Sequence, residues 1–186
     1  MIHPQAIVES TSIGKGTRIW PFAHILKGAV VGENCNICEQ CFVEGGARIG
    51  NGVVLKNGVS IWDKVTLEDY VFVGPHAVFT NDPVPRAAPA WKASQGEWQE
   101  TLVREHATVG ANATILCGIE LGAYSFVGAG AVVTRSVQAY ERVLGVPARH
   151  AGWVCRCGWL LDDNPCQRCG ARFAMGAAGP VFEKPC

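Results

Sequence analysis

Residues 49–78 divide into five groups of six, IGNGVV, LKNGVS, IWDKVT, LEDYVF and VGPHAV. Each group begins with an aliphatic residue and has a small or β-branched residue at its fifth position. The pattern extends beyond this stretch, because every sixth residue from Ile7 to Phe79 is large and apolar. It breaks at about residues 80–102 and resumes from Val103 to Val133. In a chain that is 48% hydrophobic, a run of this length is far beyond chance.

A period of six matches neither the 3.6-residue repeat of a helix nor the two-residue alternation of a half-buried strand, and it is typical of a hexapeptide β-helix. Each unit supplies a short strand with its aliphatic side chain inward and then a corner where only a small side chain fits. Three units close one triangular coil. The sequence therefore predicts an all-β parallel β-helix of about six coils, in which stacking stabilises coils that cannot fold singly.

The composition excludes several classes of protein. Sixteen basic and sixteen acidic residues give no net charge, and no Lys/Arg cluster marks a nucleic-acid or membrane-surface site. No apolar run reaches the roughly 18 residues of a membrane span, and the N-terminal residues lack the features of a signal peptide. We expect a cytoplasmic protein with no nucleic-acid or membrane partner.

The repeat also sets the expected domain boundaries. Residues 1–151 form the β-helix domain, with an excursion loop at 80–102. Residues 152–174 carry four cysteines that lie outside the repeat, and residues 175–186 are expected to form a flexible tail.

Two close cysteine pairs occur in CRCGWLLDDNPCQRCG, and glycine follows each pair. This arrangement predicts a small zinc-ribbon-like appendage in which four thiolates bind a structural Zn²⁺. The expected ligands are Cys155, Cys157, Cys166 and Cys169. The first pair has one intervening residue where two is commoner. Disulfide pairing is the alternative, and it is weaker in a chain without a signal peptide.

Several segments are more specific than the repeat. They are IWPFAHI, NGVSIWDKVTLEDYVFVGP, FTNDPVPRA, TLVREHATVGANATILCG, FVGAGAVV and GVPAR. In these the chain resembles the left-handed β-helix acyltransferases, and among them the N-acetyltransferases of nucleotide-linked 3-amino sugars. The nearest resemblance is to enzymes that acetylate UDP-2-acetamido-3-amino-2,3-dideoxy-D-glucuronate for O-antigen synthesis. It implies left-handed coils, acetyl-CoA as cosubstrate and a homotrimer with active sites between subunits.

The resemblance also implies the reacting residue. In this branch the asparagine of FTN lies beside the reacting amine and the CoA sulfur accepts the proton, which gives Asn81 a catalytic role. The alternative for Asn81 is an Asx-type turn that opens the excursion. Because residues eighteen apart stack in such a coil, Asn81 is expected above Asp63, and Trp62, Asp63 and Asp82 are candidates for sugar binding. The alternative for this outward strip is a trimer contact.

Three further residues complete the predicted sugar site. His24 ends the family segment IWPFAHI and is the second catalytic candidate, with an interface histidine as its alternative. Arg86 and Lys56 are candidates for binding the diphosphate or the sugar carboxylate, and a solvated face is the alternative for both.

The resemblance places the pantetheine arm of acetyl-CoA along the later coils. The backbone is expected to bind the pantetheine chain at four small residues, Gly110, Ala111, Ala129 and Gly130. Arg149 of GVPAR is expected to bind the phosphates of acetyl-CoA. The same small residues also suit the corners of the coils.

Other functions were weighed against this prediction. A dTDP-linked 3-amino-6-deoxyhexose is the alternative substrate, and a non-catalytic β-helix scaffold is the alternative of another class. A β-helical carbonic anhydrase is excluded because Gly110 stands where a histidine four residues after His106 would be needed.

Overall fold

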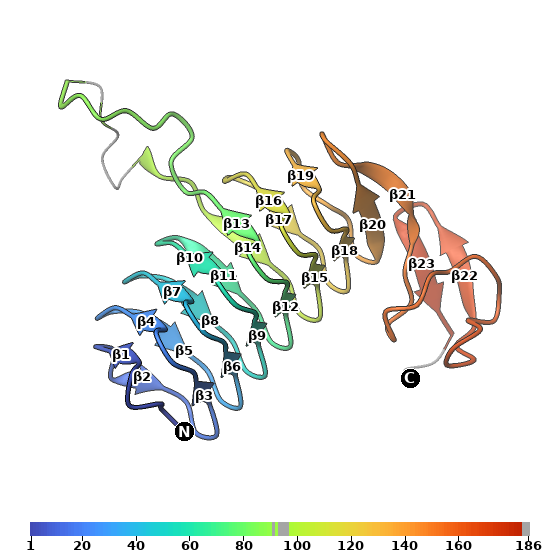
Figure 1. The fold of residues 1–186 in the computed structure, drawn as a ribbon. Coiled ribbons are helices and arrows are strands. Elements are labelled where there is room, and N and C mark those ends of the chain that lie inside the picture. Colours follow the sequence, from blue (N-terminus) through green and yellow to red (C-terminus); the bar gives the residue numbers. More distant parts are fainter. Residues whose placement is uncertain (91, 93–96, 184–186) are drawn as a thin grey trace.

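A computed structural model describes residues 1–90, 92 and 97–183, and it shows a parallel β-solenoid with three flat sheets (Figure 1). The first sheet contains β1 (Ile7–Val8), β4 (His24–Ile25), β7 (Phe42–Val43), β10 (Ser60–Ile61), β13 (Val78–Phe79), β16 (Thr114–Ile115) and β19 (Val132–Val133). The second contains β2 (Ser12–Ile13), β5 (Val30–Val31), β8 (Arg48–Ile49), β11 (Val65–Leu67), β14 (Thr101–Val103) and β17 (Glu120–Leu121).

The third sheet contains β3 (Arg18–Ile19), β6 (Asn36–Ile37), β9 (Val54–Leu55), β12 (Phe72–Val73), β15 (Thr108–Val109), β18 (Phe126–Val127), β20 (Glu141–Leu144) and antiparallel β21 (Arg149–Trp153). The chain passes from the first sheet to the second through corner 1, from the second to the third through corner 2, and back to the first through corner 3. Residues 62–64, 68–70 and 74–76 are examples of corners 1, 2 and 3. The predicted six-residue architecture is confirmed.

The stack has about seven turns, one more than the sequence predicted. The extra turn is completed by β20, whose Arg142 pairs with Phe126. These partners are sixteen residues apart, whereas Phe72 pairs with Val54 at the regular spacing of eighteen. β20 therefore leaves the six-residue phase, and a count of hexads, which ends at Val133 in β19, misses this strand.

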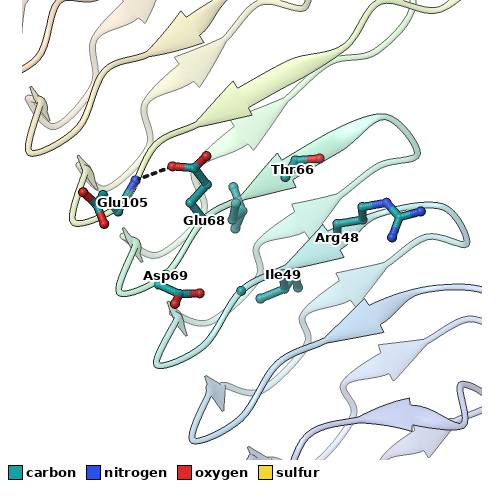
Figure 2. A pocket seen from close by; sticks show the side chains of 8 residues that line it. Arg48, Ile49, Thr66, Glu68, Asp69 and Glu105 are labelled. Atoms are coloured by element: carbon teal, nitrogen blue, oxygen red, sulfur yellow. Dashed lines mark hydrogen bonds between the residues drawn. The ribbon is translucent and has the colours of Figure 1, made fainter.

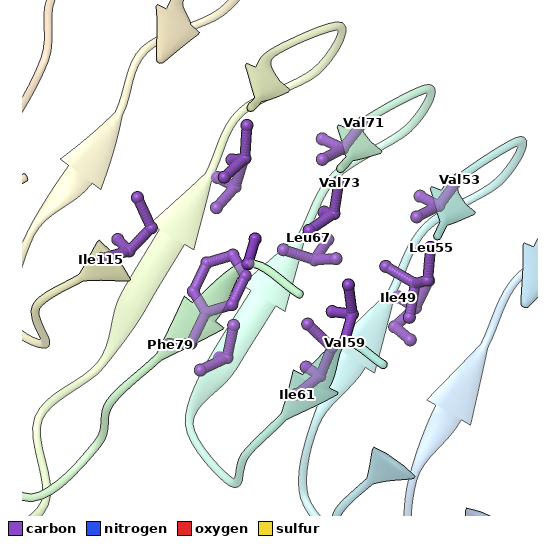
Figure 3. Packing of buried hydrophobic residues seen from close by; sticks show 14 of the residues in the cluster. Ile49, Val53, Leu55, Val59, Ile61, Leu67, Val71, Val73, Phe79 and Ile115 are labelled. Atoms are coloured by element: carbon purple, nitrogen blue, oxygen red, sulfur yellow. The ribbon is translucent and has the colours of Figure 1, made fainter. Parts of the chain in front are cut away.

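The aliphatic positions of the repeat fill the interior (Figure 3). Leu55, Ile61 and Val73 are fully buried, and Phe79 is 1% exposed. The small residues at the corners, such as Ala77, are buried beside them. Burial of a Leu, Ile or Phe side chain contributes about 1.5–3 kcal/mol, so the regular stack of layers supplies most of the stability.

Each corner needs a residue in the left-handed region, and corner 2 places aromatic residues there. Tyr70, His106, Tyr124 and Tyr140 all have φ between 58° and 62°. Their rings stack in succession with centroids 4.9, 4.6 and 5.0 Å apart. Stacking of this kind offsets the cost of a positive φ at a residue with a Cβ atom. We call these four residues the aromatic ladder.

The C-terminal segment differs from its prediction. β21 reverses direction and pairs with β20, so the expected boundary at 151/152 falls inside a strand. β22 (Phe173–Gly176) and β23 (Gly179–Phe182) then form an antiparallel hairpin. Residues 175–182 of the expected flexible tail form part of this hairpin and are paired across its strands. Residues 184–186 of that tail lie outside the described residues.

We find no helix in residues 1–90, 92 and 97–183 that is long and apolar enough to cross a membrane.

Candidate functional site

The excursion leaves the β-helix at corner 1, directly after β13, and projects away from the stack as an arm (Figure 1). Its two ends are joined by the backbone, because the N–H of Gln99 donates to the carbonyl of Asn81 at 2.8 Å. Thr80 fixes the root from the other side, since its Oγ1 accepts the N–H of Cys117 at 2.9 Å. Asn81 is therefore held at the base of the arm, next to the stack.

The side chain of Asn81 lies one turn above Asp63, as the spacing of eighteen predicted. Its Nδ2 donates to the backbone carbonyl of Asp63 at 3.3 Å. The residue is half-buried. Asp63 is itself fixed, because its N–H donates to Glu44 Oε2 at 2.8 Å and its carboxylate accepts the N–H of Lys64 at 2.7 Å. The corner thus presents an oriented amide above an ordered carboxylate.

Trp62 belongs to the same corner. Its Nε1 donates to the carbonyl of Phe79 at 2.9 Å, and its ring packs against Phe42 with centroids 5.5 Å apart. The indole is half-buried, so one part of it supports the backbone that leads to Asn81 and another part reaches the surface. Trp62, Asp63 and Asn81 are the predicted site residues that the structure brings together.

Asp82 and Arg86 lie on the arm. The carboxylate of Asp82 accepts the N–H of Val84 at 2.9 Å, which is an Asx-type turn. The turn that the sequence offered as the alternative for Asn81 is therefore made by the next residue. Arg86 is exposed, and its guanidinium contacts the carbonyl of Pro85 at 2.8 Å.

His24 is not brought to Asn81. It lies on β4, three strands before β13 in the first sheet, which corresponds to roughly 14 Å along the stack. Its Nε2 lies 3.1 Å from Glu9 Oε1, and its ring meets Phe42 edge-on at 5.8 Å. The hydrogen bond with His24, together with one from the Lys27 N–H, lowers the pKa of Glu9. His24 therefore has a structural partner within its own chain.

The residues predicted for acetyl-CoA lie at corner 3, across the first sheet from Asn81. Gly110 packs beneath Ala129 so closely that a Cβ atom at Gly110 would lie 2.4 Å from the Ala129 nitrogen. Stacking alone thus requires a glycine there. Gly130 differs, because it has φ 68° and a Cβ atom there would meet nothing within 4 Å. Ala111 also lies at corner 3, one turn before Ala129, and Lys56 lies at corner 3 of an earlier turn.

Arg149 lies in β21, at the C-terminal end of the stack. It is exposed, and its guanidinium contacts the carbonyl of Ala148 at 3.0 Å. The position agrees with a role near the later turns, but it is far from the root of the arm along the stack.

The structure gathers the four cysteines that the sequence predicted as metal ligands. The sulfur atoms of Cys155, Cys157, Cys166 and Cys169 all lie within 4.8 Å of one another. Their geometry is taken up below.

Two surface grooves lie away from Asn81. One of about 400 Å³ runs over β8 and β11, and Figure 2 shows Arg48 and Thr66 on one side and Glu68, Asp69 and Glu105 on the other. Glu68 and Asp69 there accept backbone N–H groups of Glu105 and Asn51. A second groove, of about 430 Å³, lies between Phe126 and the segment that carries Trp159. None of the predicted residues of the sugar or acetyl-CoA site lines either groove.

Sequence reasoning missed Gln99 at the base of the arm. The repeat gives no signal for Gln99, because Gln99 and Asn81 are at the two ends of the inserted loop and are not related by the eighteen-residue spacing. It also gave no functional role to Glu44, which the same spacing places one turn below Trp62 and which orients Asp63.

A family model described as bacterial transferase hexapeptide (six repeats) matches residues 10–45 and 100–135. The dTDP-3-amino-3,6-dideoxy-alpha-D-galactopyranose 3-N-acetyltransferase of Aneurinibacillus thermoaerophilus is 47% identical over 175 residues, covering 92% of this chain and 89% of that protein.

Two solved structures share the fold. The acetyltransferase domain of PglB from Neisseria gonorrhoeae, in complex with acetyl coenzyme A, aligns with a TM-score of 0.58 at 21% identity, over 81% of this chain and 56% of that one. A GDP-perosamine N-acetyltransferase variant from Caulobacter crescentus, in complex with CoA and GDP-perosamine, gives 0.55 at 22%, over 81% and 55%. The chain spans just over half the length of both. On the repeat and the full-length relative, this chain belongs to the bacterial hexapeptide-repeat transferase family.

Proposed function

We propose that the protein transfers the acetyl group of acetyl-CoA to the 3-amino group of a dTDP-linked 3-amino-3,6-dideoxyhexose. The observation that carries this proposal is the 47% identity, over nearly the whole length of both chains, to an enzyme named for that substrate class. It favours the substrate that the sequence analysis gave as the alternative over the UDP-linked uronic acid. The product would serve surface-polysaccharide synthesis.

The reaction requires a neutral amine, a donor for the developing oxyanion and an acceptor for one proton. The amine nitrogen forms a bond to the thioester carbon, and the C–S bond breaks. The ammonium proton passes to the departing sulfur, so the products are an acetamido sugar and CoA thiol. The chain need not supply a strong base for this reaction, because a thiolate leaving group accepts the proton.

Asn81 is the proposed catalytic residue. One N–H of its Nδ2 donates to the carbonyl of Asp63, and the second N–H is free to donate elsewhere. Among the described residues, its Oδ1 has no hydrogen-bond partner. The free N–H suits a carbonyl oxygen and the free Oδ1 suits an amine. Trp62, Asp63 and Asp82 would contact the sugar from the same corner, and Arg86 would approach the diphosphate from the arm.

A homotrimer is part of the proposal. Asn81 lies at corner 1, whereas Gly110, Ala111, Ala129 and Gly130 lie at corner 3 on the far edge of the same sheet. One chain therefore cannot place both groups around one acetyl group. A threefold assembly sets unlike surfaces of neighbouring chains against each other, so corner 1 of one subunit can meet corner 3 of the next.

A thiol-release assay with acetyl-CoA tests the substrate. The dTDP-linked 3-amino-3,6-dideoxygalactose and UDP-2-acetamido-3-amino-2,3-dideoxyglucuronate are compared at equal concentration, with enzyme-free and sugar-free controls. We expect turnover of the dTDP sugar, and mass spectrometry should show one added acetyl group. Turnover of the UDP sugar alone would overturn the substrate and keep the reaction. Binding of acetyl-CoA with no turnover of either sugar would favour a non-catalytic scaffold.

A further inference from the structure

The geometry of the four thiols fits a metal site. Two of the sulfur pairs, Cys155 with Cys169 and Cys157 with Cys166, are 3.6 and 3.7 Å apart. A tetrahedral zinc ion with Zn–S bonds of 2.3 Å holds its sulfurs about 3.8 Å apart. A disulfide requires about 2.05 Å. The sulfurs are therefore spaced for a shared metal and not for direct bonds between them.

A backbone hydrogen bond closes a turn, here called a knuckle, around each cysteine pair. The N–H of Gly158 donates to the carbonyl of Cys155 at 2.8 Å, and the N–H of Gly170 donates to that of Cys166 at 2.8 Å. Both glycines have positive φ, 81° and 73°. The first knuckle is one residue shorter than the second, and in both the glycine after the second cysteine closes onto the first.

The segment that carries the cysteines has little apolar interior of its own. The hydrophobic residues buried in the described chain after residue 153 are Val154, Cys155, Cys166 and Phe173. Two of these four are proposed ligands. So small a core does not order a segment of about thirty residues, and natural domains of this size depend on a metal or on disulfides.

The hairpin β22–β23 packs on the end of the solenoid. The ring of Phe182 lies 5.1 Å from Tyr140, the last member of the aromatic ladder, and the guanidinium of Arg156 lies 4.7 Å from the Phe182 ring. Gly179 lies against Trp153 of β21, where a Cβ atom would approach the indole to 2.7 Å. In the sequence Arg156 lies between Cys155 and Cys157. The turn that carries the first cysteine pair therefore also contacts the hairpin, through Arg156 and Phe182.

A second link ties the other knuckle to the hairpin. The side chain of Asn164 donates to the carbonyl of Phe173 at 2.6 Å and accepts its N–H at 3.3 Å. Cys166 donates its N–H to the carbonyl of Ala171 at 2.9 Å. Both knuckles therefore lead directly into contacts of β22–β23.

We propose that Cys155, Cys157, Cys166 and Cys169 bind one Zn²⁺, and that the metal locks residues 154–182 as a cap on the last turn of the β-helix. Four thiolates leave no open coordination position, so the ion is structural. A solenoid requires a terminal cap because its final turn has no neighbour to cover its strands. The proposal does not depend on the sugar substrate.

Metal analysis of the full-length protein tests the binding site. The protein is purified without chelator or metal-affinity steps and measured by inductively coupled plasma mass spectrometry. We expect about one zinc per chain, with loss of that zinc in Cys157→Ser and Cys166→Ser. Cys38→Ser is the matched control, since Cys38 lies in the repeat, and it should retain the zinc. Replacement by Co²⁺ should give the absorption bands of tetrahedral thiolate cobalt.

Hydrogen exchange tests the cap. After zinc is removed from the wild-type protein under reducing conditions, amides of β22 and β23 should exchange at least about tenfold faster, while those of β4–β16 keep their protection. Zinc re-addition should restore the slow exchange. A protein that neither contains zinc nor takes up Zn²⁺ or Co²⁺, or that holds iron instead, overturns the zinc site. Unchanged exchange of the hairpin without metal overturns the cap.

Discussion

The amide nitrogen of Asn81 donates a hydrogen bond of 3.3 Å to the backbone carbonyl of Asp63, which lies one turn earlier in the solenoid. This bond fixes the amide plane without using its oxygen. The orientation of Asn81 is therefore set by the β-helix, and the arm that follows is free to carry substrate contacts.

Replacement of Asn81 by Ala should lower kcat by about 100-fold or more, which is the usual loss when one oxyanion donor is removed. The KM for acetyl-CoA should change little, because the residues proposed for the cofactor lie at corner 3. The oligomeric state, measured by light scattering, should be that of the wild type. An unchanged kcat would remove Asn81 from the reaction.

Gly46→Ala and Gly28→Ala form a matched pair at corner 1. Both glycines have positive φ, 95° and 92°, so both variants should lose about 1–2 kcal/mol of stability from backbone strain. A Cβ atom at Gly46 would also lie 2.1 Å from Asp63 Oδ1, whereas one at Gly28 meets nothing closer than 3.7 Å. We expect Gly46→Ala alone to displace the carboxylate and raise the KM for the nucleotide sugar.

Thermal unfolding and steady-state kinetics measure the two effects separately. If both variants raise the KM equally, backbone strain and not the position of Asp63 is responsible.

The repeat predicted the column of residues at corner 1 because side chains eighteen apart must stack when each turn has three equal sides. The position of Asn81 above Asp63, with Trp62 beside Asp63 at the same corner, follows from that rule. The rule fails where the turn length changes. Val143 is buried in a turn two residues shorter than the others, so no count in sixes could find it.

The rest of the candidate site depends on information that the repeat does not contain. His24 was predicted from its place in the family segment IWPFAHI and Lys56 from its charge, whereas their distance from Asn81 is set by which turn and which corner they occupy. The hairpin was missed because Phe182 packs on Tyr140, a contact between distant segments that no local pattern signals, and Phe173 packs in turn on Phe182.

Glu141 supports the last turn. It is 3% exposed, its Oε2 accepts the N–H of Gln138 at 2.8 Å, and its Oε1 lies 3.2 Å from His150 Nδ1 and 3.4 Å from Arg135 Nη2. Glu141→Ala leaves these donors without their partner and should cost about 1–3 kcal/mol of unfolding free energy. Chemical denaturation monitored by circular dichroism measures the loss.

The exposed Glu33 provides the control for this measurement. Glu33→Ala should leave the unfolding free energy within about 0.5 kcal/mol of the wild type. Equal midpoints for the two variants would show that the buried carboxylate contributes nothing to the end of the stack.

Cys41 should be inert to alkylation in the folded protein. Burial raises the pKa of its thiol to about 12, and the side chain is 1% exposed. At pH 8 roughly one Cys41 thiol in ten thousand is ionised, so iodoacetamide should modify the partly exposed Cys117 before Cys41. Peptide mass spectrometry after native labelling checks this order.

The same pKa has a consequence for stability. The unfolded chain ionises Cys41 near its ordinary pKa of 9, whereas the folded protein keeps the proton up to about pH 12. The unfolded state therefore binds fewer protons in that interval, and stability falls as the pH rises through it. Cys41→Ala should weaken this dependence, and an identical pH profile would contradict the assignment.

The arm at residues 80–100 has one property that bears on how such a protein arises. Thr66 pairs with Leu102 and Phe72 with Thr108, each thirty-six residues apart, whereas the regular turns, such as the one from Val54 to Phe72, are separated by eighteen. The inserted length equals one complete turn. Because the segment leaves the stack and rejoins it at corner 1, it moves no later residue to the wrong face (Figure 1). On the proposed function, insertion or loss of residues at this position alters the sugar site and leaves the scaffold unchanged.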